Sequence, residues 1–249
     1  MKSKIPLFKS HYSIGRSILT LEKAGESIKT GPDSIIDLAL DNKLSKIVLI
    51  EDSMIGLPEA ATNCNSANID LHFGVRLTVT ADSKNKTEES EETSHKCIIM
   101  AKNESGIKSL IKIYTNAYSE ECFYYEPRTD FDYLVSFWNE NLQLCIPFYD
   151  SFLYQNSLTF NRCVPDFNVI KPVFFLEDNG LPFDPLLREK VKDYTGDKYE
   201  TVETQSVYYA ARKDFKAYLT YKCLNKRTVL NKPNLEHCMS DSFCLENII

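Results

Sequence analysis

The chain has 249 residues, 43% of them hydrophobic, which suits one large α/β domain or two small ones with a sizeable core. Its formal net charge of −6 disfavours broad, non-specific binding to duplex DNA, because such binding depends on a basic surface. No apolar run approaches the roughly 18 residues that span a bilayer, so the sequence gives no support to a membrane role.

The chain contains eight cysteines, and none of them forms a Cys-x-x-Cys pair. Several lie in apolar runs, as in Leu144-Cys145-Ile146, which is typical of buried free thiols that pack as small hydrophobic residues. No signal peptide precedes them, so we expect reduced thiols and a cytoplasmic protein. The cysteines are Cys64, Cys97, Cys122, Cys145, Cys163, Cys223, Cys238 and Cys244.

Segments typical of strands and of helices alternate along the chain. After an extended run over 6–13, strands are expected at 47–50, 71–80, 97–100, 142–148, 173–176 and 204–209. Helices are expected at 34–40, 57–67, 104–118, 131–137, 186–194 and 214–224. This alternation predicts an α/β fold of parallel βαβ units, and about seven repeats suit a barrel as well as an open sheet.

Two of the expected helices have a clear apolar side. The first follows Gly31-Pro32-Asp33-Ser34, and its apolar residues are Ile35, Ile36, Leu38, Ala39 and Leu40. The helix over 104–118 is amphipathic, and its apolar residues are Ile107, Leu110, Ile111 and Tyr114.

We expect a single domain over residues 1–249. The run 81–94 is polar and acidic and lacks apolar periodicity, so it predicts a solvated, mobile loop between two strands. Residues 225–249 are irregular, and this tail could dock on a partner or on the rest of the domain.

Two short motifs in the first quarter of the chain resemble those of one known family. Lys9, His11 and then Tyr12-Ser13 resemble a His-x-His pair followed by Tyr-Ser, with Lys9 at the first histidine position. After the strand at 47–50, Asp52 and Ser53 resemble an Asp-His pair before a glycine loop, with Ser53 at the histidine position. These are motifs of the PHP (polymerase and histidinol phosphatase) family.

Two further motifs follow in the order of the family. Phe73-Gly74-Val75-Arg76 is similar to a segment with Gly-x-Glu, whose glutamate bridges metals, and Arg76 stands at the glutamate position. Thr204 to Tyr209 is similar to Thr-Asn-Asp-x-His-Tyr, with Ser206 at the aspartate and Tyr208 at the histidine. The resemblance covers almost the whole chain and is strongest to the PHP domain that opens the alpha subunit of bacterial DNA polymerase III.

The resemblance implies a distorted (β/α)7 barrel of the PHP type, with the site at the carboxyl ends of the strands. Members with an intact site hold up to three divalent metals and hydrolyse phosphoesters, in some polymerases as a proofreading exonuclease. Members with a degraded site are structural domains of the polymerase.

The ligand set implied by the family is depleted in this chain. His11 and Asp52 remain as weak candidates for metal ligands, with Glu51 as a further carboxylate. Lys9 and Arg76 would repel a divalent cation by several kcal/mol at a few Å in a cavity of reduced dielectric constant. We therefore expect no cofactor, and we expect Lys9 or Arg76 to pair with Asp52 or Glu51 in place of the metals.

Two alternatives stay open at the same positions. Lys9, His11 and Arg76 could form a metal-free anion-binding pocket, because arginine suits bidentate phosphate contacts. The chain could also be a metal-dependent phosphoesterase or 3′–5′ exonuclease with an unusual site, which would need manganese, magnesium or zinc. The remaining histidines have no ligand spacing and are interpreted as ordinary surface or structural residues; they are His72, His95 and His237.

The favoured hypothesis is a metal-deficient, non-catalytic PHP-like scaffold or binding module in DNA replication. Its expected partners are a polymerase, a clamp or a clamp loader, and a small or viral genome is the expected source. Polymerase activity is not expected from this chain. The aromatic run Phe123-Tyr124-Tyr125 could stack on bases, but a core or interface role is favoured because no basic residues interleave with it.

Overall fold

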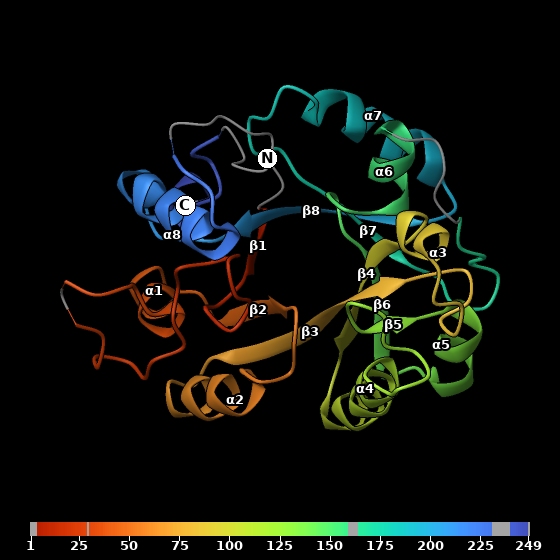
Figure 1. Ribbon diagram of the computed structural model, residues 1–249. Coiled ribbons are helices and arrows are strands. Elements are labelled where there is room, and N and C mark those ends of the chain that lie inside the picture. The colour runs from red at the N-terminus through yellow and green to blue at the C-terminus, as the bar shows by residue number, and fades with distance from the viewer. Residues whose placement is uncertain (1–3, 29, 159–163, 231–239, 249) are drawn as a thin grey trace. The chain divides into compact units, whose positions relative to one another are not determined.

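The computed structural model describes residues 4–28, 30–158, 164–230 and 240–248, and strands and helices alternate along them (Figure 1). The strands are β1 (Ile5–Phe8), β2 (Lys46–Glu51), β3 (Asp70–Val79), β4 (His95–Ala101), β5 (Arg128–Thr129), β6 (Leu142–Ile146), β7 (Val173–Leu176) and β8 (Glu200–Val207). The helices are α1 (Ile35–Asp41), α2 (Leu57–Ser66), α3 (Glu88–Glu92), α4 (Glu104–Ala117), α5 (Phe131–Phe137), α6 (Phe152–Leu158), α7 (Asp184–Thr195) and α8 (Phe215–Lys226), with short 3-10 helices η1 (Arg212–Asp214) and η3 (Leu245–Asn247).

Within these described residues the strands form one sheet in the order β2-β1-β8-β7-β6-β4-β3-β5, and β2 also pairs with β3. This additional pairing closes seven strands into a ring, to which β5 is attached through β3. The expected distorted (β/α)7 barrel is thereby confirmed. Strand β1 lies between two parallel neighbours, so that Leu7 is opposite Val48 on β2 and Ser206 on β8.

The expectation of parallel strands throughout is wrong at β4. This strand pairs antiparallel with β6, and Ile99 lies opposite Leu144. Alternation of strands and helices cannot reveal the reversal, because the segment before β4 carries only the five-residue helix α3. A helix of that length spans about 7 Å, far less than the roughly 23 Å of a seven-residue strand, so it is not a full crossover helix.

Helix α1 begins where the sequence predicts. The side chain of Ser34 accepts a hydrogen bond from the backbone N–H of Ile36 at 3.1 Å, which satisfies one of the free donors at the helix start. Ile35, Ile36 and Ala39 are buried as expected, whereas Leu40 is 44% exposed. The apolar side is therefore narrower than the sequence suggests.

Helix α4 buries a face that is rotated from the expected one. Asn103 caps it by accepting a hydrogen bond from the backbone N–H of Gly106 at 3.0 Å. Leu110 and Ile113 are fully buried, whereas Ile111 is 45% exposed. With 3.6 residues per turn, Ile113 lies close to Leu110 on the same face, while Ile111 lies about 100° away from it.

The acidic segment 81–94 joins β3 to β4 and contains helix α3. Most of its residues are exposed, but Ser83 and Ser90 are buried. The guanidinium of the fully buried Arg128 donates to the carbonyl oxygen of Ser83 at 3.0 Å and to Oγ of Ser90 at 3.2 Å. The segment is therefore anchored at two points by a cation that the sequence did not single out, and its mobility stays a prediction.

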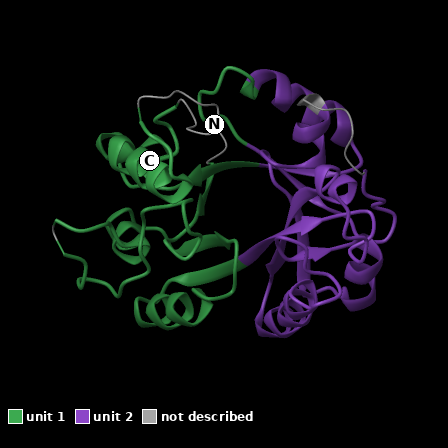
Figure 2. Cartoon of the chain, viewed as in Figure 1, with its two compact units in different colours: residues 1–73, 177–184, 203–249 green, residues 74–176, 185–202 purple. Residues whose placement is uncertain are grey.

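The chain divides into two compact units (Figure 2). Unit 1 comprises residues 1–73, 177–184 and 203–249, and unit 2 comprises residues 74–176 and 185–202. Each has buried apolar residues, including Phe8 and Leu49 in unit 1 and Ile99 and Phe174 in unit 2. The single domain expected over 1–249 stays a prediction.

The described part of the C-terminal tail, residues 240–248, packs within unit 1. Tyr209, just after β8, forms a parallel bridge with Cys244, and Phe243, Cys244 and Leu245 are buried. Of the eight cysteines, Cys163 and Cys238 lie outside the described residues; the other six are free and buried. No helix in the described ranges combines the length and apolarity needed to cross a membrane.

Candidate functional site

The first family motif lies where two parallel strands of unit 1 end. Lys9 follows β1 and Asp52 follows β2, so their side chains start at the same edge of the sheet. The ammonium Nζ of Lys9 lies 3.0 Å from Oδ1 of Asp52, and the Lys9 side chain is only 7% exposed. Nε of Arg16 lies 3.8 Å from the other carboxylate oxygen. The expected pairing of Lys9 with a carboxylate is present, and Asp52 faces two cations.

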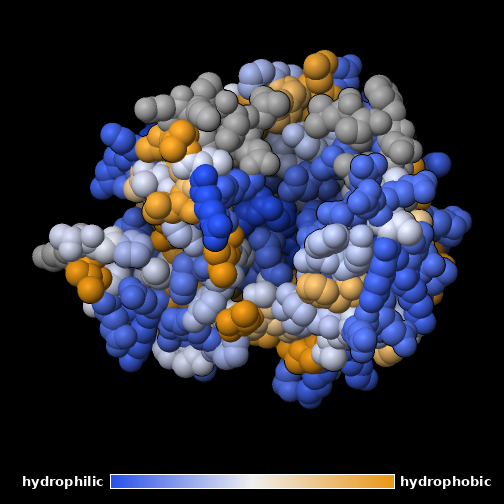
Figure 3. Space-filling model, viewed as in Figure 1, coloured by the Kyte–Doolittle hydropathy of each residue, from blue (hydrophilic) through white to orange (hydrophobic). Residues whose placement is uncertain are grey.

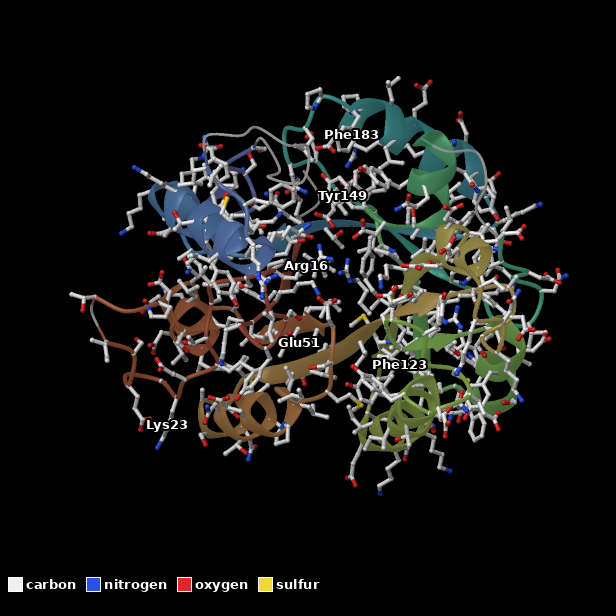
Figure 4. The ribbon with its side chains drawn as sticks, viewed as in Figure 1. Arg16, Lys23, Glu51, Phe123, Tyr149 and Phe183 are labelled. Atoms are coloured by element: carbon white, nitrogen blue, oxygen red, sulfur yellow. The ribbon has the colours of Figure 1, made fainter. Side chains whose placement is uncertain are left out.

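Glu51, the last residue of β2, directly precedes Asp52 and is fully buried, with Lys9 near enough to act on its charge. Figure 4 labels it close to β2. Its carboxylate accepts the backbone N–H of Ser10 at 2.8 Å and the hydroxyl of Ser13, and Oγ of Ser13 in turn accepts the backbone N–H of Asp52 at 2.9 Å. Burial raises the pKa of Glu51, and Lys9, Ser10 and Ser13 oppose that rise by stabilising the charged form. Each oxygen of Glu51 thus accepts a hydrogen bond from a neutral donor, which leaves fewer lone pairs for a metal.

His11 is the one histidine that falls on a family motif. Its ring packs against Tyr12 with 4.3 Å between centroids, and its Nδ1 is buried without a hydrogen-bond partner among the described residues. The hydroxyl of Tyr12 donates to Glu59 at 2.6 Å, and this bond raises the pKa of Tyr12. Ser53, at a family histidine position, accepts a long 3.4 Å hydrogen bond from the backbone N–H of Ile55 in its own loop.

A second buried carboxylate of unit 1 occupies the end of β7. Glu177 is 3% exposed and accepts the backbone N–H and the hydroxyl of Ser206 at 2.8 and 2.9 Å, and the side-chain amide of Asn179 at 2.8 Å. Burial raises the pKa of Glu177, and the bonds from Asn179 and Ser206 oppose the rise. Ser206 stands at the family's aspartate position and here acts as a neutral donor. Sequence reasoning missed Glu177, although a charged residue directly after an apolar strand was the available signal.

Tyr208, at the family's last histidine position, is packed between aromatic rings. Its ring lies nearly parallel to those of Tyr218 and Phe243, at centroid distances of 5.8 and 5.4 Å. Its backbone carbonyl accepts the hydroxyl of Ser17 at 2.9 Å and the N–H of Ile18 at 3.1 Å. Its backbone N–H donates to the carbonyl oxygen of Phe243 at 3.0 Å, so the residue joins the tail to the end of β8 through both packing and a hydrogen bond.

Arg76, at the position of the metal-bridging glutamate, lies on β3 in unit 2. Its guanidinium NH1 lies 2.7 Å from Oδ2 of Asp150, and its side chain is 10% exposed. On the same strand, Thr78 donates to Glu126 at 2.5 Å, and Lys96 lies 2.6 Å from the other oxygen of Glu126. Burial favours a higher pKa for Glu126, but Lys96, Thr78 and Arg76 outweigh it and hold that pKa below its ordinary value.

The other histidines do not join these positions. His72 lies 2.8 Å from Asp70 on the exposed start of β3, and His95 is buried with its ring 5.5 Å from that of Phe152. His237 lies outside the described residues. Across the residues that the structure describes, no group of three or more histidine, cysteine, aspartate or glutamate side chains is arranged to hold a metal ion.

Comparison with known proteins identifies the family of this chain. A family model described as PHP domain matches residues 27–154, which is more than half of the chain. The chain belongs to the PHP domain family. Over 59 residues this PHP chain is also 42% identical to the DNA polymerase III subunit alpha of Aquifex aeolicus (strain VF5), in a match that covers 22% of this chain and 5% of that protein. The chain thus matches a small part of this relative, and the resemblance drawn from the sequence is confirmed.

The metals implied by the PHP family do not fit the residues found here. In unit 1, an ammonium lies on the aspartate that the family motif retains, and serine donors occupy the neighbouring buried glutamate. In unit 2, the family's bridging glutamate is replaced by Arg76, which carries the same sign of charge as the ion it would have to bind. Lewis-acid chemistry at these positions therefore lacks a suitable set of donors.

Proposed function

We propose that this PHP chain is a metal-deficient, non-catalytic module that acts as a scaffold or binding protein in DNA replication. The observation that carries the proposal is the ion pair of 3.0 Å between Lys9 and Asp52. The ammonium of Lys9 is almost fully buried and neutralises the Asp52 carboxylate, so no bound metal ion is needed for that charge. The positions of the family's metal site then have a structural role.

The similarity to a DNA polymerase III alpha subunit supports a role in DNA replication, because that subunit belongs by name to a DNA polymerase. A polymerase, a clamp or a clamp loader is accordingly the partner class that we propose. The six buried free thiols suit a reducing compartment such as the cytoplasm. The net charge of −6 argues for protein partners over broad duplex-DNA binding.

Two assays test the absence of catalysis. Metal content is measured by mass spectrometry after dialysis, and hydrolysis of p-nitrophenyl phosphate and of a 3′-labelled single-stranded oligonucleotide is followed with added manganese. The parent protein is compared with Asp52→Asn and His11→Ala. We expect no stoichiometric metal and equal background turnover in all three, and turnover that either substitution abolishes would refute the proposal.

The binding role is tested separately with purified polymerase, clamp and clamp-loader proteins from the same source as the chain. Surface-immobilised chain should retain at least one of them reversibly. Failure to retain any of the three would remove the replication role while leaving the catalytic result untouched.

A metal-dependent phosphoesterase or 3′–5′ exonuclease is the second candidate function. It is favoured by one observation: Nδ1 of His11 is buried and has no hydrogen-bond partner in the part of the chain that the structure describes, and an imidazole nitrogen in this state could accept a metal or a proton. Manganese-dependent turnover that His11→Ala abolishes would establish this candidate.

The third hypothesis, an anion-binding pocket formed by Lys9, His11 and Arg76, has less support than the two functions above. Lys9 and Arg76 each already lie against a carboxylate. Inorganic phosphate that raises the melting temperature of the parent but not of His11→Ala would support it.

A further inference from the structure

Unit 2 carries a pocket of about 400 Å³ that belongs to none of the family motifs. It lies between the start of the acidic segment, the end of α4 and the first turns of α5. A volume of this size is at the low end of ligand sites and suits one long side chain better than a nucleotide. The residues of its wall that matter here are Asp82, Lys84, Glu121, Asp130, Asp132 and Tyr133.

The wall of the pocket is acidic. Asp130 serves the fold, since its carboxylate caps α5 by accepting the backbone N–H of Tyr133 at 2.8 Å and also accepts the hydroxyl of Ser83 at 2.5 Å. Lys84 lies 3.2 Å from Glu121, and both side chains are at least 70% exposed. One lysine thus faces several carboxylates, and the pocket favours a cation over an anion.

Two exposed aromatic side chains, Tyr118 and Phe123, lie close to the pocket in the chain and form what we call the aromatic ledge. They are 45% and 40% exposed. The rings of Tyr118 and Phe123 lie 6.1 Å apart, and Phe123 directly follows Cys122, which lines the pocket. Figure 4 labels Phe123 beyond the end of α4, and the neighbouring surface over α3 and α5 is largely hydrophilic (Figure 3).

We propose that the pocket and the aromatic ledge bind a basic peptide segment, with an arginine or lysine side chain in the pocket and an apolar neighbour on the ledge. Charge complementarity selects this partner, because acidic walls attract a guanidinium or ammonium group and repel phosphates. Aromatic faces next to a carboxylate also stabilise cations directly. The aromatic run is thereby assigned to peptide recognition rather than to base stacking.

This surface is separate from the charge pairs at the strand ends. It lies within unit 2 and uses none of the motif positions. The peptide-binding proposal therefore goes beyond the proposed function, and different experiments test the two proposals.

The test follows fluorescence anisotropy of a fluorescein-labelled peptide amide, Arg-Leu-Arg-Leu, at an ionic strength of about 0.15 M. A peptide with citrulline in place of arginine has the same shape without the charge. The double substitution Glu121→Gln with Asp132→Asn should weaken binding about tenfold, and Phe123→Ala should weaken it about fivefold.

The matched control removes two charges from exposed positions of unit 1, Glu22→Gln with Glu26→Gln, and should change binding by less than about twofold. Circular dichroism confirms that each variant folds. If both double variants weakened peptide binding equally, net charge alone would explain the loss, and the proposal would be overturned. Equal binding of the citrulline peptide, or displacement of the peptide by a single-stranded oligonucleotide, would overturn it as well.

Discussion

Replacing Lys9 by methionine tests whether an internal ammonium holds the first family motif together. Methionine keeps most of the length and apolar volume of the lysine stem and removes the charge. In the variant, Asp52 loses the ammonium at 3.0 Å while Arg16 stays 3.8 Å away, and the fully buried Glu51 loses its nearby cation. We therefore expect a less stable protein whose fold is unchanged.

The size of the effect follows from the geometry. At 3.0 Å between Nζ and Oδ1, and an effective dielectric constant of about 20, the attraction is about 5 kcal/mol. Desolvation of the lysine offsets most of this in the intact protein, so the pair contributes little net stability. Removing the lysine takes its positive charge away from both Asp52 and Glu51. Because Asp52 is 31% exposed, we expect a loss of about 2–3 kcal/mol, at or below the lower end for a broken buried pair.

The loss should depend on pH. Burial raises the pKa of Glu51 in the folded protein, and removal of Lys9 raises it further. A carboxyl group with a raised folded-state pKa favours the fold below its unfolded pKa, and that contribution is lost as pH rises through the folded pKa. The part of the Lys9→Met deficit that Glu51 carries is therefore largest near neutral pH, and it fades as pH falls through the raised folded-state pKa of Glu51, before the ordinary value of 4.5 is reached.

Urea unfolding followed by far-UV circular dichroism measures the loss for Lys9→Met, for Asp52→Asn and for the double variant. We expect the two single variants to be coupled by about 1–3 kcal/mol, with the double variant more stable than the sum of the single losses predicts. A Lys9→Met protein as stable as the parent at pH 7, or fully additive losses, would refute the reasoning.

Three further predictions concern other parts of the chain. Ser206→Asp restores the family's aspartate but places a second carboxylate beside the buried Glu177, so we expect it to lower the free energy of unfolding by about 3 kcal/mol or more at pH 7. Urea unfolding measures this loss, and Ser206→Asn is the milder control. Equal unfolding midpoints for the two variants would contradict the prediction. Gly106→Ala would drive a Cβ into the backbone carbonyl of Asn141 and should cost about 2 kcal/mol, seen as a lower melting temperature; an unchanged one would be the contrary result. Burial raises the pKa of the Cys97 thiol to about 12, so a disulfide reagent at pH 8 should label it only after unfolding, and rapid labelling of the native protein would count against its burial.

The sequence predicted most elements of the fold because their signals are local. Helix α5 and strand β7 have the predicted bounds, since each is an apolar run with clear boundaries. Helix α6 was not predicted: Phe152 and Leu153, which it buries, come only a few residues after the expected strand at 142–148 and gave no separate helical period. The reversal of β4 has no local signature, because the direction of a strand is set by the path of the chain between strands.

The site was predictable only in part for a similar reason. Lys9 and Asp52 meet because they follow adjacent parallel strands, which motif order and fold already imply. The partner of Arg76 was not predictable, since Asp150 lies in a turn with a positive φ of 64° after β6, and no pattern links it to β3. Likewise, the bond from Ser206 to Glu177 depends on which strand ends are neighbours in the closed sheet.

Restoring a metal site should need more than one substitution, because neutral hydrogen-bond donors now stabilise the buried carboxylates. Ser13 and the backbone of Ser10 occupy both oxygens of Glu51, and Ser206 does the same for Glu177. A metal at Glu51 would have to compete with these bonds and with the nearby ammonium of Lys9, and a metal at Glu177 would have to compete with the bonds from Ser206. Lys9→His alone should therefore bind manganese no more tightly than the parent in titration calorimetry. Stoichiometric binding by that single variant would mean that the serine bonds are weak and that the lysine alone excludes the ion.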